Sequence, residues 1–158
     1  MPALRRPAPA RAAALLLAAA ALSLTGCSAT NPVTTNQAYA ASDGVDITLG
    51  GLQFGNLLVL SAEQGAPGTV LGSVTNTAGA DVRLEIGLSG ELTTLAVPAG
   101  ETVLLGPDDA AVDLATVPSP PGALVEVVMT SDADGSATVM APVLDGTLEQ
   151  YAALVPQP

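Results

Sequence analysis

The residues best suited to covalent chemistry are Leu24, Thr25, Gly26 and Cys27, the last being the single cysteine of the chain. They close an apolar run over residues 12–24. A run of this length is typical of an export signal, because a membrane-spanning helix needs about 20 apolar residues. The small side chains of Thr25 and Gly26 leave the backbone open to a peptidase, and the thiol of Cys27 can then take a diacylglyceryl group. The pattern therefore predicts a lipobox with Cys27 as the lipidated N-terminus.

The residues before the lipobox support this interpretation. Arg5, Arg6 and Arg11 form a basic leader ahead of the apolar run, so residues 1–26 are predicted to be a lipoprotein signal peptide. A second small-residue cleavage pattern, at residues 38–40, lies too far beyond the run. Two or three acyl chains, at about 0.8 kcal/mol per buried CH₂, hold a protein durably at a bilayer. We expect the protein at the cell membrane, on its extracytoplasmic face, with the membrane as a partner through the lipid anchor.

The charge of the remaining chain excludes one class of partner. Removing residues 1–26 leaves one basic side chain, Arg83, against fifteen carboxylates, a formal net charge of −14. A surface this negative is repelled by phosphate backbones and anionic lipid headgroups. Nucleic acid is therefore excluded as a partner, and a spacer between the lipid and the acidic body becomes useful.

The mature chain divides into a tether, a body and a tail. Residues 27–42 carry the lipidated cysteine and a polar stretch without apolar periodicity, which predicts a flexible tether. Residues 43–146 alternate short β-branched or leucine-rich runs with Gly, Pro, Asn and Asp, which predicts an all-β, antiparallel β-sandwich of the immunoglobulin or cupredoxin-like type. Residues 147–158 are expected to form a short C-terminal helix and tail.

Turn residues predict which strands pair. Residues 77–79, 98–100 and 132–135 each separate two strand-like runs and predict three hairpins. The alternation of Val82, Leu84, Ile86 and Leu88 with polar or small residues predicts one buried and one solvated face. The strands are expected at residues 45–49, 52–62, 69–76, 81–88, 91–97, 102–105, 111–117, 123–130 and 136–143.

The tail has a helical pattern. Thr147 with Gln150 three residues later is a candidate capping box, and Leu148, Tyr151, Ala152 and Val155 recur at helical spacing. We expect this helix to end at Pro156 and to dock its apolar stripe on the sandwich; the alternative is that the stripe binds a partner.

Two stretches resemble a known family. Residues 97–114, VPAGETVLLGPDDAAVDL, and residues 120–144, PPGALVEVVMTSDADGSATVMAPVL, are similar to parts of the PCuAC-type periplasmic copper chaperones. The strand at residues 69–76, which ends in Asn76, is also similar to a strand of that family. The resemblance implies a small cupredoxin-like sandwich.

The copper ligands that the resemblance implies are missing. In that family a His-x-Met motif follows the glycine-proline corner, whereas this chain has Ala111, Val112 and Asp113 there and no histidine anywhere. Met129 and Met140 are the only methionines after the signal peptide. Two thioethers alone make a poor site for cuprous ion, so both are expected to fill the core. We predict no metal site and no cofactor.

Two groups of carboxylates are alternative candidates for a metal site, because oxygen ligands suit a hard cation such as calcium. Asp108, Asp109 and Asp113 gather around one corner and could supply oxygen ligands to calcium, but the expected role is a solvated charged edge that discourages edge-to-edge pairing. Residues 132–135 lack the remaining ligands of an EF-hand loop and are expected to be a hairpin turn.

Catalysis is not expected. Without histidine or lysine in the mature chain, a serine or threonine nucleophile has few bases beyond a carboxylate, and no spacing singles out a carboxylate pair for glycoside hydrolysis. We predict a lipid-anchored, noncatalytic binding module with an envelope protein as its partner. The alternative is a divergent copper-chaperone-like protein that handles metal at the cell envelope.

Overall fold

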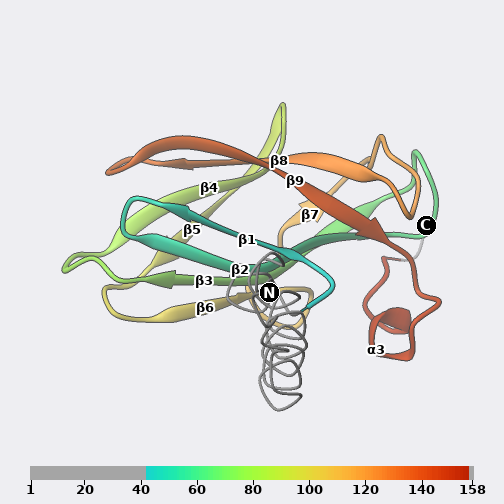
Figure 1. The fold of residues 1–158 in the computed structure, drawn as a ribbon, viewed down its shortest axis with the longest axis horizontal. Helices are drawn as coiled ribbons and strands as arrows, with labels where there is room; N and C mark the ends of the chain where they lie inside the picture. The colour runs from blue at the N-terminus through green and yellow to red at the C-terminus, as the bar shows by residue number, and fades with distance from the viewer. Residues whose placement is uncertain (1–41, 157–158) are drawn as a thin grey trace, which may run out of the picture. The chain divides into compact units, whose positions relative to one another are not determined.

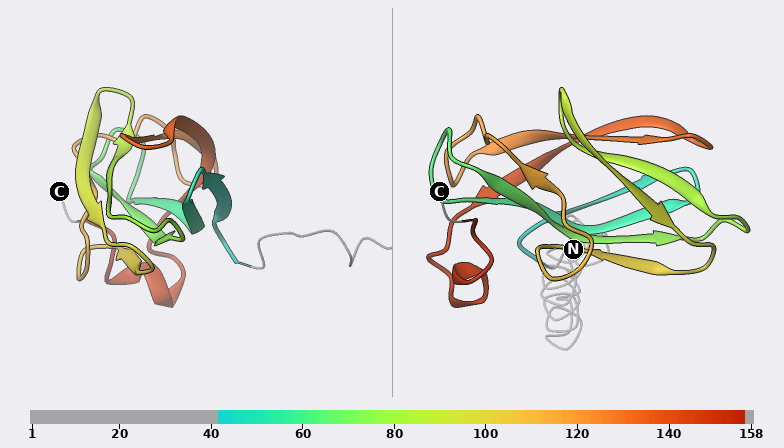
Figure 2. Two further views of the ribbon diagram at one scale, coloured as in Figure 1. Left: turned by 90° about the vertical axis from the view of Figure 1, so that its left-hand side faces the viewer. Right: turned by 180° about the vertical axis from the view of Figure 1, so that it is seen from behind.

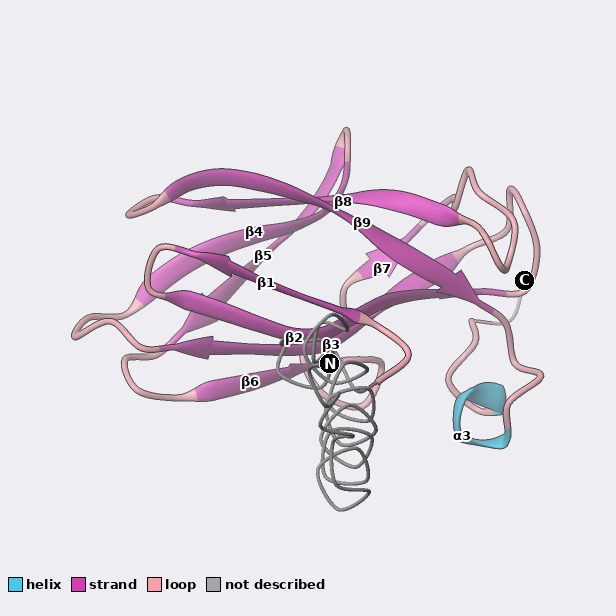
Figure 3. Ribbon diagram, viewed as in Figure 1, coloured by secondary structure: helices cyan, strands magenta, loops and turns pink. Residues whose placement is uncertain are grey.

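The computed structural model describes residues 42–156, which form β-strands and one turn of helix (Figures 1 and 3). The elements are β1 (Val45–Leu49), β2 (Leu52–Ser61), β3 (Gly68–Asn76), β4 (Val82–Leu88), β5 (Glu91–Val97), β6 (Thr102–Leu105), β7 (Asp113–Leu114), β8 (Leu124–Ser131), β9 (Gly135–Leu144) and α3 (Glu149–Ala152). Within this part of the chain, no helix has the length and apolar character needed to cross a membrane.

The strands form two layers. The first sheet holds β1, β2, β3, β6 and β7, and the second sheet holds β4, β5, β8 and β9. The layers are joined along β9, whose Val143 and Leu144 pair in parallel with Val59 and Leu60 of β2. The connected order is β5-β4-β8-β9-β2-β3-β6, and Figure 2 shows these strands on both sides of the interior. The predicted all-β sandwich is confirmed, with one parallel pair in an otherwise antiparallel arrangement.

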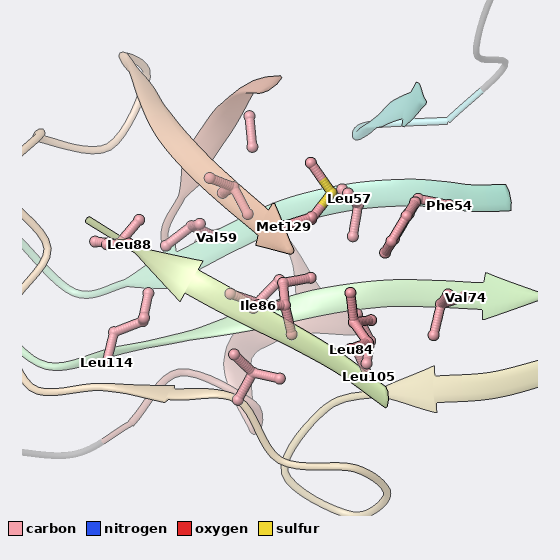
Figure 4. Packing of buried hydrophobic residues seen from close by; sticks show 14 of the residues in the cluster. Phe54, Leu57, Val59, Val74, Leu84, Ile86, Leu88, Leu105, Leu114 and Met129 are labelled. Carbon is pink, nitrogen blue, oxygen red and sulfur yellow. The ribbon is translucent and has the colours of Figure 1, made fainter. Parts of the chain in front are cut away.

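The interior between the sheets is almost entirely aliphatic. Leu84 and Ile86 of β4 and Val59 of β2 are fully buried, and Phe54 is the one aromatic side chain among them (Figure 4). The alternation predicted for residues 82–88 is confirmed, because Val82, Leu84, Ile86 and Leu88 all point inward. Burial of these side chains is the main stabilising term of the sandwich. We call this set of side chains the main core.

Two predicted hairpins are wrong. Strand β3 does not pair with β4, and β5 does not pair with β6, because each pair is split between the two sheets. The buried Asn76 provides the reason: its Nδ2 donates to the carbonyls of Ala80 at 2.8 Å and Val97 at 2.9 Å. Its backbone also bonds Gly100 and Glu101. Both connections therefore cross between the layers at this residue.

The third hairpin is confirmed. Residues 135–142 of β9 run antiparallel to β8, closing at Ser131 and Gly135. The Ser131 hydroxyl accepts hydrogen bonds from the backbone amides of Ala133 and Asp134, each at 3.2 Å. The acidic residues of this loop therefore form a turn, as expected, and Asp134 also accepts a hydrogen bond from the Gly51 amide at 3.3 Å.

The C-terminal helix is shorter than predicted. It spans Glu149–Ala152, its N-cap is Leu148, and no side chain caps it. The predicted capping box at Thr147 is wrong, because the Thr147 hydroxyl and amide both donate to Asp145 instead. The predicted docking is confirmed for Tyr151 and Val155, which pack on the outer side of the first sheet. It is wrong for Leu148, which is 46% exposed, and for Ala152, which is also exposed.

Candidate functional site

The predicted lipidation site lies outside the described residues. Leu24, Thr25, Gly26 and Cys27 all precede residue 42, and so does nearly all of the predicted tether. The lipobox therefore stays a prediction from the sequence. The sites below belong to the β-sandwich.

The position of the expected copper motif is filled by structural residues. Val112 is fully buried, and its carbonyl accepts hydrogen bonds from the Val70 amide at 3.0 Å and the Thr69 hydroxyl at 3.3 Å. Ala111 and Asp113 flank it at the surface. This stretch closes the edge of β3, and its side chains offer no imidazole or thioether.

The two methionines lie on opposite faces of one sheet. Met129 on β8 is fully buried in the main core, as predicted. Met140 on β9 is 49% exposed, so its predicted core role is wrong. The register explains this: Met140 lies opposite the exposed Glu126, whereas Met129 lies opposite Ala137 on the inner face. Their sulfur atoms therefore cannot share one metal ion within a protomer.

The three corner carboxylates do not converge on one point. Asp108 and Asp109 are exposed in the turn that follows β6, whereas Asp113 lies on β7 and pairs with Thr69. Within residues 42–156, no group of three or more acidic, histidine or cysteine side chains is placed to hold a metal ion.

A concave site does lie at this corner. Backbone bonds from Asp109 to Gly106 at 3.1 Å and from Ala110 to Leu104 at 3.1 Å fold residues 106–110 back along β6. The turn borders a hollow of about 450 Å³, which we call the corner groove. Its lining comprises Gly55, Asn56, Leu71, Gly72, Ser73, Leu104, Leu105, Gly106, Pro107, Asp108, Asp109 and Leu154.

The corner groove has leucine side chains in a mixed lining and an acidic rim. Leu71 and Leu105 are almost fully buried in its lining, while Leu104 is 53% exposed. Asp108 and Asp109 are exposed at the same hollow. Such a combination suits recognition of a ligand that is apolar in one part and cationic in another.

A bulge in β2 shapes the floor of the groove. The register of β2 against β3 shifts between Gly55 and Leu58. Asn56 adopts a left-handed conformation with φ of 53° there, held by hydrogen bonds to the Gly44 amide and to Asp46 Oδ1, both 2.8 Å. On the facing strand, Gly72 has φ of 146°, and a Cβ on it would lie 2.9 Å from the Gly55 carbonyl oxygen. A side chain at residue 72 would therefore push the two strands apart.

Sequence reasoning did not find this groove, although two signals for it are present. A glycine followed by asparagine inside a strand indicates a bulge. Two adjacent leucines, Leu104 and Leu105, on a strand of four residues require one of them to point outward. Neither signal predicts that the turn at residues 106–110, the bulge in β2 and Leu154 of the tail lie next to one another.

A second hollow next to the groove is polar. It has a volume of about 480 Å³, is bordered by Asp46, Gln53, Ser73 and Thr75, and adjoins the corner groove at Gly55 and Ser73. Two of its polar groups already have partners: Asp46 accepts from Asn56 at 2.8 Å, and the Thr75 hydroxyl bonds that of Thr102 at 2.8 Å. These two side chains are therefore already engaged within the protein.

One titratable side chain links the tail to the start of the sandwich. The Tyr151 hydroxyl donates to Asp43 Oδ2 at 2.8 Å. Burial, together with the bond to the Asp43 carboxylate and its negative charge, raises the pKa of Tyr151 above its usual value of 10.0. Tyr151 therefore stays protonated and acts as a structural donor at neutral pH.

Comparison with known proteins identifies the fold. No protein-family model and no curated protein matches this chain. Among solved structures, the copper-bound PCuAC domain from PmoF2 aligns with a TM-score of 0.53 and 16% identity, covering 63% of this chain and 97% of that domain. The apo PCuAC domain from PmoF1 aligns with a TM-score of 0.54 and 13% identity, covering 62% and 97% respectively. The resemblance noted in the sequence is thus confirmed in the structure, and this protein contains a β-sandwich with the fold of the PCuAC domains.

Proposed function

We propose that this protein is a lipid-anchored extracytoplasmic lipoprotein whose sandwich acts as a noncatalytic interaction module. The observation that supports the module most directly is the combination of a PCuAC-type fold with the loss of the copper motif. The motif position holds Ala111, Val112 and Asp113, and the chain has no histidine. A sandwich of this fold that lacks the copper-binding side chains would act by binding other molecules through its surface.

The anchor is proposed from the sequence around Cys27. Replacing Cys27 with Ala should release the protein from the membrane fraction into the medium or the soluble periplasm. Ser28→Ala is the matched control, because it changes the neighbouring residue and keeps the thiol. Mass spectrometry of the wild-type protein should show an acylated Cys27 as its first residue. An intact leader, or an unmodified thiol in the exported product, would contradict the anchor.

A noncatalytic role is supported by the types of side chain that the chain contains after residue 26. After residue 26 the chain has no histidine and no lysine, and its one arginine, Arg83, lies on β4 beside Glu85 and Asp132. General bases near neutral pH are most often histidine or a carboxylate with a raised pKa. The hydrogen bonds from Thr147 lower the pKa of Asp145, which is the direction opposite to that needed by a general base near neutral pH.

The partner test uses intact cells. Crosslinking in the native host, followed by purification of this protein, should recover one envelope protein reproducibly. The Cys27→Ala protein, displaced from the membrane, should recover much less of it. Recovery of only lipids and abundant membrane proteins would count against the interaction module.

Copper handling is the second candidate, and the likeness to a copper-bound PCuAC domain favours it. Titration of the purified full chain with Cu(I) against a competing chelator separates the two proposals. If the sandwich is an interaction module, the titration should show no tight stoichiometric site. Cu(I) prefers thioether and imidazole donors, and this chain has no histidine, while Met129 and Met140 lie on opposite faces of one sheet. A stoichiometric site of submicromolar affinity would favour copper handling, and loss of that affinity in Met140→Leu would place it at the exposed methionine.

A further inference from the structure

The corner groove combines leucine side chains with two exposed carboxylates, those of Asp108 and Asp109, around one hollow. Leu104 is 53% exposed on its wall, and the nearly buried Leu71 and Leu105 line it. Its volume of about 450 Å³ lies within the range of roughly 300–1,000 Å³ usual for ligand pockets. An exposed leucine beside such a hollow gives an incoming apolar side chain a surface to bury.

The acidic rim has no cation of its own. Arg83 is the one basic residue among residues 42–156, and it lies on β4 of the second sheet, in a hollow that it shares with Glu85 and Asp132. Leu104 and the corner that carries Asp108 and Asp109 belong to the first sheet, on the outer side of β3. The carboxylates of Asp108 and Asp109 can therefore attract a positively charged group of another molecule.

We propose that the corner groove binds a basic, apolar segment of a partner protein, with an aliphatic or aromatic side chain against Leu104 and a lysine or arginine at Asp108 and Asp109. This inference rests on the proposed interaction module and names its binding surface and the chemistry of its partner. The apolar contact supplies affinity and the charged contact supplies orientation and association rate.

One other occupant and one other surface fit less well. A metal ion would meet two carboxylates among apolar side chains, whereas calcium takes six to eight oxygen ligands. The outer face of β8 and β9 also exposes apolar side chains, Leu124 at 53% and Met140 at 49%. The hollow beside them is smaller, about 320 Å³, and holds a single carboxylate, Glu126. That face serves as the control surface.

The test measures binding of a defined probe to the full chain. The protein is purified from its host into phosphatidylcholine nanodiscs, and a fluorescein-labelled hexapeptide of alternating lysine and leucine is titrated by fluorescence anisotropy, with empty nanodiscs as the blank. We expect saturable binding that weakens as salt rises, because added ions screen exposed charge pairs. A hexapeptide of alternating glutamate and leucine should not bind.

Variants then locate the site. Leu104→Ala should weaken binding about fivefold by removing the apolar wall. The double variant Asp108→Asn with Asp109→Asn should weaken it by a similar factor, about fivefold, and flatten its salt dependence. The matched controls are Leu124→Ala, with the same exposure as Leu104, and Glu126→Gln; both should leave the affinity unchanged within about twofold. Circular dichroism and melting curves of each variant establish that the fold is intact.

The outcomes separate this inference from the proposed function. Absence of saturable binding, or equal loss in the groove and control variants, would overturn the groove as the docking site. Calcium binding that requires Asp108 and Asp109, without peptide binding, would assign the acids to a cation instead. If cell crosslinking recovers an envelope partner equally well with Leu104→Ala, the interaction module stands and the groove proposal fails.

Discussion

The main core and a smaller apolar cluster on the outside of the first sheet are built differently. The main core lies between the sheets and draws on nearly every strand. The smaller set, which we call the outer cluster, joins Leu58, Leu60 and Leu71 of the first sheet to Tyr151 and Val155 of the tail. The first is enclosed by the sandwich itself, and the second exists only because the tail covers it.

The difference is visible along β2. Leu57 and Val59 face the main core, while Leu58 and Leu60 face the tail. A strand with one wet face alternates apolar and polar residues, whereas a strand covered on both faces is continuously apolar. The comparison indicates that the sandwich folds on the main core and that the tail adds a separate, weaker layer. The predictions below test this order of importance.

The largest effect is expected in the main core. Ile86→Ala removes a fully buried side chain from β4, and the cavity and lost burial should lower the free energy of unfolding by about 3 kcal/mol. Urea denaturation monitored by circular dichroism measures this. Leu92→Ala on the neighbouring β5, where Leu92 is 41% exposed, is the control and should cost less than about 1 kcal/mol. Equal losses in the two variants would contradict the assigned core.

A smaller, local effect is expected in the outer cluster. Tyr151→Ala uncovers Leu58, Leu60 and Leu71, and should lower the free energy of unfolding by about 2 kcal/mol. The β-sheet signal in circular dichroism should stay, and binding of a hydrophobic dye should rise. If Tyr151→Ala unfolds the whole protein at 25 °C, the outer cluster is part of the main folding unit and the distinction between the two clusters is wrong.

The sequence predicted the main core well because its signal is local. Alternation within residues 82–88 and the turn at residues 132–135 each need only neighbouring residues, and both predictions are confirmed. Most strand ends also lie within one residue of those expected, since glycine, proline and aspartate mark them. The exception is the strand expected at residues 111–117, of which the structure has only Asp113–Leu114 as β7.

The predictions that failed depend on distant contacts. Whether residues 77–79 make a hairpin or a crossover is decided by Asn76, whose side chain reaches Val97, a residue distant in the sequence. Met140 was misplaced because its face follows from the register with Glu126. The corner groove is formed by residues of β2, β3, β6 and the tail, and the sequence of any one of these segments does not predict their contact with the others. Local patterns thus specify elements, while pairing and sites require the tertiary structure.

A still smaller effect isolates the polar contact of the outer cluster. Tyr151→Phe keeps the ring but loses the hydrogen bond to Asp43, and should cost about 1 kcal/mol. The pKa of Tyr151 is raised in the folded state, so its contribution is complete below the unfolded pKa of 10.0 and declines as pH rises above that value.

Unfolding measured from pH 8 to pH 11 tests this. The wild type should lose stability above about pH 10 more steeply than Tyr151→Phe does. Tyr39→Phe, at the other tyrosine of the chain, is the matched control and should behave as the wild type. An unchanged alkaline profile in Tyr151→Phe would remove Tyr151 as the group responsible.

The smallest effect is expected in the turn that leads from β9 to the tail. Asp145 accepts hydrogen bonds from the hydroxyl and the amide of Thr147, which lower its pKa below 3.8. The folded state therefore favours the charged form, so this contribution is present at neutral pH and declines as pH falls below 3.8 and through the lowered pKa of the folded state. Asp145→Asn keeps an acceptor oxygen but loses the charge, so its melting temperature should fall by about 1 °C at pH 7, and the difference from the wild type should shrink as the pH is lowered below 3.8. Because this turn positions α3, dye binding should stay low in Asp145→Asn if packing of Tyr151 and Val155 alone holds the tail. A rise in dye binding to the level of Tyr151→Ala would show instead that the polar turn, and not the apolar contact, controls the outer cluster.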